Sequence, residues 1–223
     1  MDSRVKREYL ELVAHYTHKF YAAKLSPSHD SGDLSVRDPE TGLIYCDPRP
    51  SATLSIPNWS VVQPDDILVF DIDGNKVWSA EDRFETVELP MHLAIYRRYP
   101  EYNAIVHAHP IWSAAYCIIG EDIPAALAEQ ALYIGGDVAC AEYGAVGSWD
   151  LADNVVKALE KTGSKAALVA NHGSVACGAD MEEAFSVAEY LEHCAQTNIL
   201  ARAMGGKIKH IDMDNLIDPD VEL

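Results

Sequence analysis

The chain has 223 residues, and 17 lysines and arginines against 35 aspartates and glutamates give it a net charge of −18 at pH 7. A surface this acidic repels phosphate-rich polymers and anionic lipids, so nucleic acid and membranes are excluded as favoured partners. Hydrophobic residues make up 48% of the chain, which is enough for a packed core and argues against disorder. We therefore expect one globular domain over residues 1–223, with an acidic tail over 206–223.

The five cysteines are odd in number and form no C-x-x-C pair, so neither a disulfide framework nor a thiolate zinc site is indicated. The N-terminal residues are polar and lack the apolar run of a signal peptide, and no stretch of 18 apolar residues occurs. We therefore expect a cytoplasmic protein with reduced thiols.

The first half of the chain is expected to contain one long helix followed by short strands. Apolar residues recur at helical spacing from Val5 to Phe20, and Pro27 marks the end of this helix. Residues 26–57 are rich in serine, aspartate, proline and glycine, which indicates turns between strands. The expected strands are 34–36, 43–45, 67–72 and 76–78, the last two joined as a hairpin by the turn 73–75.

The second half of the chain alternates between helices and strands. Pro90 is tolerated in the first turn of a helix, and Pro100 ends that helix. The expected helices are 85–99, 111–118, 148–163 and 181–204, and the expected strands are 104–109, 138–140 and 166–170. This mixture of hairpins and helices predicts an α/β fold, a single domain with a central mixed or antiparallel sheet flanked by helices.

Three histidines stand where strands are expected to end. His107 and His109 point to the same face of a strand about 6.6 Å apart, and His172 follows the next long apolar strand. Gly173 permits a positive φ and a sharp turn that can bring His172 off the strand end. An H-x-H pair alone is more often two ordinary polar residues, but three imidazoles with no thiolate, together with Glu88 upstream, indicate a catalytic zinc-type site.

Four segments carry a resemblance to a known family. They are 31–37 (SGDLSVR), 88–96 (ELPMHLAIY), 105–109 (IVHAH) and 171–173 (NHG) with the following Gly178. Their order and spacing, over about residues 5–200, resemble the class II aldolase/adducin family, in particular its zinc-dependent L-fuculose-1-phosphate aldolases. The resemblance implies a three-layer αβα fold and a C4 homotetramer with active sites at subunit boundaries.

The resemblance also implies which residues form the site. Zn²⁺, or another divalent metal, would be bound by His107, His109 and His172, with Glu88 as acid/base and as a ligand in the resting enzyme. The implied activity is that of a lyase that cleaves a ketose, expected to be phosphorylated, through a metal-stabilised enediolate. For Glu88 the simpler alternative is a carboxylate that stabilises a helix N-terminus.

The chain departs from the family where phosphate is expected to bind. Thr86-Val87 stands in place of a Ser-Ser pair, residues 47–55 (DPRPSATLS) in place of a Thr-Pro-Ser/Thr-Gly turn, and Asp33 in place of an asparagine. We expect the substrate to be bound by Asp33, Arg49, Thr53 and Thr86.

Two further features of the site are open from the sequence. No tyrosine follows Tyr190, although some aldolases of the family use one there as proton donor, and Tyr133 or Tyr143 is the candidate substitute. His92, one helical turn after Glu88, is either an orienting partner of Glu88 or a partly buried helix residue.

Three other functions are compatible with this pattern. A metal-dependent decarboxylase of a sugar acid or oxo acid would keep the metal and tolerate the altered phosphate motif. A 4-epimerase of a pentulose phosphate is less favoured, because related epimerases resemble this pattern with aspartate in the position of Glu88. An adducin-like scaffold would retain the fold without the chemistry, and the complete set of three histidines argues against it. Metal analysis discriminates the enzyme from the scaffold.

Overall fold

One eight-stranded sheet forms the centre of the computed structural model, which describes residues 2–28, 31–50 and 58–217. The strands are β1 (Asp33–Arg37), β2 (Ile44–Cys46), β3 (Leu68–Phe70), β4 (Lys76–Trp78), β5 (Ala104–Ala108), β6 (Cys140–Ala141), β7 (Ala166–Val169) and β8 (Gly173–Gly178). Their order in the sheet is β4-β3-β2-β1-β5-β8-β7-β6. All pairs are antiparallel except β6 with β7, so the mixed sheet expected from the sequence is confirmed.

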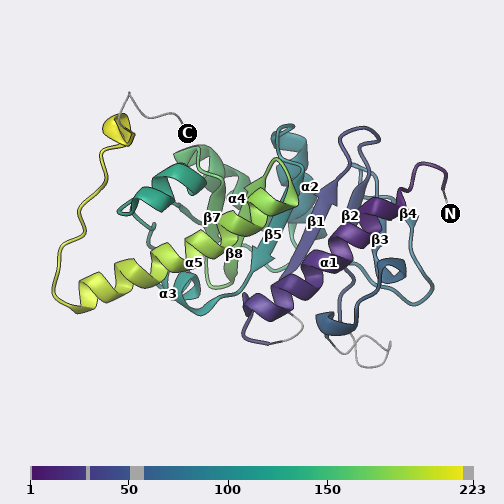
Figure 1. Cartoon of the computed structure of the whole chain (residues 1–223), viewed down its shortest axis with the longest axis horizontal. Coiled ribbons are helices and arrows are strands. Elements are labelled where there is room, and N and C mark those ends of the chain that lie inside the picture. The colour runs from purple at the N-terminus through teal and green to yellow at the C-terminus, as the bar shows by residue number, and fades with distance from the viewer. Residues whose placement is uncertain (1, 29–30, 51–57, 218–223) are drawn as a thin grey trace.

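Helices cover both faces of the sheet (Figure 1). They are α1 (Arg7–Ala23), α2 (Leu89–Arg98), α3 (Ile111–Ile119), α4 (Trp149–Thr162) and α5 (Met181–Ala203). The purple α1 and the lime-green α5 lie side by side in front of the sheet. Between these helices, the ring centroids of Tyr16 and Phe185 are 5.6 Å apart. Helices α2 and α4 pack on the opposite face, where they share a second apolar cluster with the strands. The three-layer α/β architecture is therefore confirmed.

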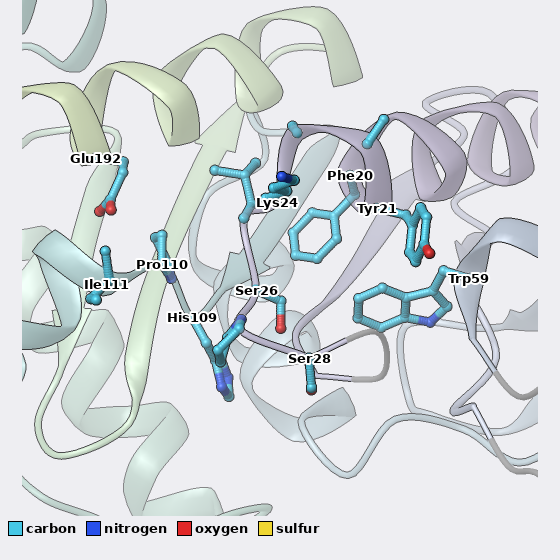
Figure 2. Close-up of a pocket in the computed structure, with 14 residues that line it drawn as sticks. Phe20, Tyr21, Lys24, Ser26, Ser28, Trp59, His109, Pro110, Ile111 and Glu192 are labelled. Carbon is cyan, nitrogen blue, oxygen red and sulfur yellow. The ribbon is translucent and has the colours of Figure 1, made fainter.

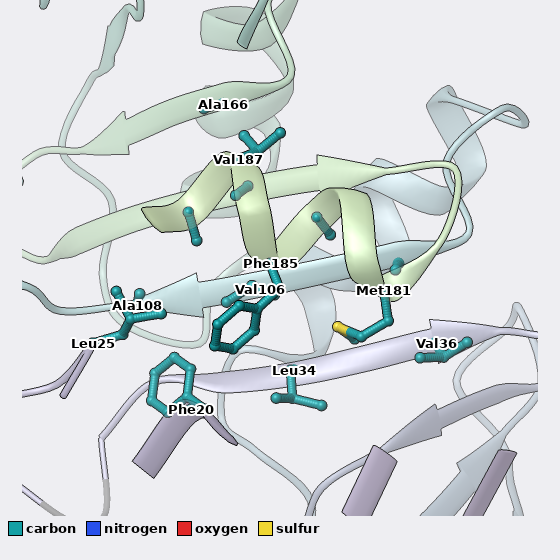
Figure 3. Packing of buried hydrophobic residues seen from close by; sticks show 14 of the residues in the cluster. Phe20, Leu25, Leu34, Val36, Val106, Ala108, Ala166, Met181, Phe185 and Val187 are labelled. Atoms are coloured by element: carbon teal, nitrogen blue, oxygen red, sulfur yellow. The ribbon is translucent and has the colours of Figure 1, made fainter. Parts of the chain in front are cut away.

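The front apolar layer is built from side chains that alternate along the central strands. Figure 3 shows Phe20 and Phe185 reaching from the helices toward Leu34 of β1 and Val106 of β5. All four are at most 1% exposed. Since successive strand residues point to opposite faces, the neighbours Ser35 and His107 face the layer that α2 covers.

Local signals in the sequence explain where the helices begin and end. The Ser148 hydroxyl accepts a hydrogen bond from the amide of Leu151 at the start of α4, and Gly163, at φ 67°, ends that helix in the left-handed conformation. Asp180 caps α5 in the same way through the amide of Glu183. None of the described helices has the length and apolar character needed to cross a membrane.

Within the described residues, several elements differ from the sequence-based expectation, and three of them are of particular interest. The helix expected over 85–99 spans Leu89–Arg98, because the residues before Leu89 form irregular structure and a turn in place of a helical turn. Strand β8 was not expected, since its six residues are all buried and show no alternation of polar and apolar side chains. The π-helix Gln130–Ile134 was also not expected, and it ends at Gly135, whose φ is 97°.

Candidate metal centre and substrate cavity

Three histidines converge where β5 ends and β8 begins. Because these strands are antiparallel, with His107 opposite Val175 and Ala108 opposite Ser174, the end of β5 lies beside the start of β8, which His172 directly precedes. The three imidazole rings of His107, His109 and His172 have centroids 4.7 to 4.9 Å apart, and their ligand nitrogens all lie within 4.8 Å of one another. The convergence predicted from the H-x-H pair and the distant histidine is therefore present.

The turn before β8 uses a different residue for its unusual backbone than the sequence suggested. Asn171, with φ 56°, takes the left-handed conformation, and Gly173 does not. Glycine is needed at 173 for space, since an added Cβ would lie 2.4 Å from the Ala108 carbonyl oxygen and 2.7 Å from Cδ2 of His109. The expectation of a positive φ at Gly173 was wrong, and the close approach of two strand ends is the reason that glycine stands there.

The protein holds these imidazoles uncharged. Burial lowers the pKa of His107 to about 3 and the pKa of His109 to about 4, and burial also lowers the pKa of His172. Nδ1 of His107 lies 2.9 Å from the carbonyl oxygen of Ser174 and donates to it, which leaves Nε2 as a lone-pair donor. A neutral imidazole with a fixed tautomer is the form that binds metal ions.

Glu88 lies immediately before α2, facing the histidines. Its Oε1 lies 3.9 Å from Nε2 of His172 and accepts a hydrogen bond of 3.3 Å from the amide of Gly147. Glu88 is the N-cap residue of α2, where its carboxylate can interact favourably with the helix dipole, but its side chain makes no capping hydrogen bond to the helix. Burial, with a contribution from the negative charge of Asp33, raises the pKa of Glu88 to about 7.

The donor set fits a divalent metal ion. Nε2 of His107 and Nε2 of His109 are 2.9 Å apart, close to the separation of about 3.3 Å for two nitrogens on one zinc ion. The buried Oε2 of Glu88 and Nδ1 of His172 have no hydrogen-bond partner in the described part of the protein. Three neutral imidazoles and a carboxylate are ligands that zinc and related metals accept.

Asp33 is the second carboxylate at this site. It lies opposite His107 in the pairing of β1 with β5, and paired residues project to the same face of the sheet. Its Oδ1 is 2.8 Å from Nε2 of His92, and its Oδ2 accepts the hydroxyl proton of Thr86. Although burial opposes its ionisation, His92, with smaller contributions from His107 and Thr86, lowers the pKa of Asp33 to about 2.

His92 supports Asp33 and not Glu88. It is fully buried, with Nδ1 2.7 Å from the hydroxyl of Ser35, which in turn lies 2.9 Å from the hydroxyl of Tyr96. The proposed orienting contact with Glu88 is therefore replaced by a buried polar chain that ends at Asp33. Sequence reasoning missed this chain because its members come from β1 and α2, which are far apart in the sequence.

A cavity of about 210 Å³ is lined by the three histidines, the carboxylates of Asp33 and Glu88, Arg49 and Thr86. Three of the four residues expected to bind substrate thus line one space, while Thr53 lies outside the described residues. The exposed Arg49 lies at its rim, with its guanidinium 5.6 Å from the ring centre of Phe84. Val87, which stands in place of a serine of the family pair, and Val146 contribute apolar side chains to the wall.

A larger cavity of about 530 Å³ lies on the other side of His109 (Figure 2). Its wall includes Phe20 and Trp59, and Figure 2 shows Glu192 on the opposite side. The Glu192 carboxylate accepts hydrogen bonds from the amides of Trp112 and Ser113 at the start of α3, so it is already engaged.

Neither candidate tyrosine is among the described residues that line the histidine cavity. Tyr133 stacks on Tyr190 with ring centres 4.3 Å apart, and Tyr143 is 67% exposed. A proton-donor role for either would need a contribution across a subunit boundary.

A family model and individual relatives indicate the same protein family for this chain. Residues 11–199 match the family model described as "Class II Aldolase and Adducin N-terminal domain". A 5-deoxy-D-ribulose 1-phosphate aldolase from Bacillus thuringiensis serovar kurstaki is 29% identical over 214 residues, which cover 95% of this chain and 94% of the relative. An L-fuculose phosphate aldolase from Methanococcus maripaludis strain C5 is 32% identical over 174 residues, 78% of this chain and 87% of the relative.

Solved structures agree with the sequence comparisons. A structure of an L-fuculose 1-phosphate aldolase superposes with a TM-score of 0.85 at 31% identity, covering 95% of this chain and 94% of that chain. The likeness therefore extends over the whole sheet and both helical layers.

Proposed function

Because the chain belongs to the class II aldolase and adducin family, we propose that it is a metal-dependent aldolase that cleaves a carbon–carbon bond of a ketose. The observation that supports this most strongly is the convergence of three uncharged imidazoles and the Glu88 carboxylate on one cavity. Relatives named as aldolases of 1-phosphorylated ketoses support a sugar or sugar phosphate as substrate.

We propose zinc as the metal, held by His107, His109 and His172, with Glu88 as a further ligand when no substrate is bound. A divalent cation there supplies positive charge against the negative charge that develops on the ketose oxygens as the bond breaks. The acidic chain needs such a cation, because its net charge of −18 does not attract an anionic substrate.

Glu88 is proposed to move the proton. In the metal-free protein, burial raises the pKa of this carboxylate to about 7, so it takes up a proton more readily than an exposed glutamate, which favours a role as general acid/base. Its Oε2, buried and unpaired, is the atom available to take a proton from a substrate hydroxyl and to return it. Arg49, Asp33, Thr86 and Thr53 are proposed to orient the substrate.

We also propose that the protein assembles as a homotetramer. Two apolar residues on the cavity wall, Val87 and Val146, are 47% and 60% exposed, and the nearby Trp149 is 47% exposed. Apolar side chains around the mouth of a substrate cavity are typical of an interface that a second subunit covers. Light scattering on the purified protein measures the number of subunits directly.

Metal content tests the site. The wild-type protein is expected to retain about one zinc ion per chain through gel filtration, and His107→Ala is expected to retain none, because two imidazoles bind zinc far more weakly than three with a preorganised shell. His193→Ala is the matched control, since His193 is exposed on α5 away from the cavity. Equal zinc stoichiometry in His107→Ala and His193→Ala would contradict the proposed site.

A further inference from the structure

Asp33 is a buried carboxylate that faces the substrate cavity. It is 5% exposed, stands at the start of β1 and lines the cavity together with Thr86 and the three histidines. A charge in such a position is fixed by its neighbours, here the imidazole of His92 at 2.8 Å. A substrate in the cavity therefore meets the Asp33 carboxylate at the inner wall.

Asp33 also engages the Thr86 hydroxyl in a hydrogen bond, so that this hydroxyl cannot donate to a bound anion. The single hydroxyl proton of Thr86 is donated to Oδ2 of Asp33, and a lone pair of the same oxygen accepts the amide of Glu88 at 3.1 Å. The next residue, Val87, has no polar side chain. At this wall of the cavity, the Thr86-Val87 pair consequently supplies no side-chain donor to a phosphate.

The same carboxylate suits an uncharged hydroxyl. A carboxylate offers about four acceptor positions, and the Thr86 hydroxyl takes one of those of Asp33, on Oδ2. Oδ1 lies 2.8 Å from Nε2 of His92 but accepts no hydrogen bond within the described residues. A ketose hydroxyl can donate to a remaining position, whereas a phosphate oxygen near it meets like charge in a poorly solvated space. Arg49, the cation that lines the cavity, is exposed at the rim with its guanidinium over Phe84.

We propose that Asp33 is a specificity-determining residue: it accepts a hydrogen bond from a ketose hydroxyl at the inner wall of the cavity and disfavours a phosphate group there. This inference rests on the proposed aldolase function and narrows its substrate class. The preferred ketose carries a free hydroxyl toward Asp33, and any phosphate it has must lie toward Arg49 at the rim.

Binding of a matched pair of probes tests the proposal. Dihydroxyacetone and dihydroxyacetone phosphate differ only by the phosphate group, and their Kd values are measured by calorimetry on zinc-loaded wild-type protein and on Asp33→Asn. In the wild type, we expect the phosphate to tighten binding by no more than about threefold. In Asp33→Asn, which removes the charge with little change in shape, we expect the preference for the phosphorylated probe to rise at least tenfold.

Asp47→Asn is the matched control. Asp47 is buried next to β1 without lining the cavity, and burial together with the charge of Asp33 raises its pKa well above the ordinary value, which favours its uncharged form. Its Oδ1 accepts the amide of Leu34, a role that an asparagine oxygen retains. The probe preference is therefore expected to stay at the wild-type value in Asp47→Asn.

Three results would overturn the proposal. The first is a preference for the phosphorylated probe in Asp33→Asn that equals the wild-type preference, and the second is an equal rise of that preference in Asp47→Asn. The third is a wild-type protein that binds dihydroxyacetone phosphate more than about thirtyfold tighter than dihydroxyacetone, a measurement that requires no variant. Inorganic phosphate, which does not depend on the ketose, repeats the comparison and should bind Asp33→Asn at least tenfold tighter than wild type. Since every readout is binding, failure of cleavage would count against the proposed function and not against the role of Asp33.

Discussion

The two carboxylates in the cavity have pKa values that are shifted in opposite directions, and their surroundings explain why. Asp33 is stabilised as an anion by His92 and Thr86 despite its burial, and its pKa falls to about 2. Glu88 has one weak amide partner, and burial raises its pKa to about 7. Groups whose environments separate their pKa values in this way commonly divide the roles of fixed charge and proton carrier.

Replacing Glu88 tests the role of proton carrier. We expect Glu88→Gln to keep the fold and most of the metal but to lower kcat by roughly 10²- to 10⁴-fold, the usual contribution of a positioned acid/base. Turnover and metal content are measured on the same preparation. A kcat equal to that of the wild type would show that another group transfers the proton.

The raised pKa of Glu88 also predicts how the stability of the metal-free protein depends on pH. The folded-state pKa, about 7, exceeds the ordinary value of 4.5, so between these pH values the unfolded chain loses a proton that the folded protein retains. The contribution of Glu88 to stability should therefore decrease as pH rises from about 4.5 to 7, by at most about 3 kcal/mol and less with solvent screening.

Urea unfolding of metal-free wild type and Glu88→Gln isolates this contribution from that of the histidines. The difference in free energy of unfolding between the two proteins should grow with pH across this range, in favour of the variant. A difference that is constant with pH would contradict the raised pKa.

The sequence predicted which titratable residues meet in the cavity but not their hydrogen-bond partners. His107, His109, His172 and Glu88 were found because their residue types and spacing suggest metal chemistry. The direction of the Thr86 hydroxyl and the contact of Asp33 with His92 depend on how β1 and α2 pack, and no local pattern encodes that packing.

At the level of elements, the site depends on how closely β5 approaches β8. The carbonyl of Ala108 and the ring of His109 occupy the space where a side chain at position 173 would begin. The carbonyl of Ser174, one residue further along β8, accepts from His107. Strand β8 therefore contributes to the proposed metal centre through its backbone.

Gly173→Ala is expected to disturb the metal centre without changing any ligand. The added Cβ would lie 2.4 Å from the carbonyl oxygen of Ala108, so the strand ends must separate, at a cost of about 1–3 kcal/mol in stability. We expect zinc affinity to fall at least tenfold, measured by competition with a chelating dye.

Ser174→Ala is the control for this prediction. It removes a hydroxyl that makes one long bond of 3.5 Å to Ala108 but retains the backbone carbonyl used by His107. Its zinc affinity should equal that of the wild type. If Gly173→Ala also bound zinc with unchanged affinity, the close approach of the strands would not be required for the site.

Elements with strong local signals were predicted correctly, and those set by tertiary packing were not. The capped α4 and the hairpin of β3 and β4 follow from Ser148, Gly163 and the turn at 73–75. Strand β8 is buried on both faces and shows no alternation of polar and apolar residues, so its periodicity does not distinguish it from a loop. Its pairing between β5 and β7 supplies the order that the local sequence lacks.

Across the whole molecule, the strongly acidic chain contrasts with the cavity it encloses. A net charge of −18 disfavours anionic ligands, while the cavity combines three neutral imidazoles with Arg49 at the rim and a fixed carboxylate inside. A metal cation is the most direct source of positive charge for a reaction that develops negative charge on the substrate. Metal-dependent cleavage of a ketose is therefore the central property of the proposed function.

Cleavage by metal-stripped and reconstituted enzyme tests this claim most directly. The chelator-treated protein is titrated with zinc, and aldehyde release is followed from L-fuculose 1-phosphate, 5-deoxy-D-ribulose 1-phosphate and their unphosphorylated counterparts. The account predicts no cleavage without metal, recovery in proportion to zinc up to about one ion per chain for at least one of these ketoses, and no recovery in His107→Ala. Equal cleavage with and without metal, or no cleavage of any ketose by the zinc-loaded protein, would contradict it.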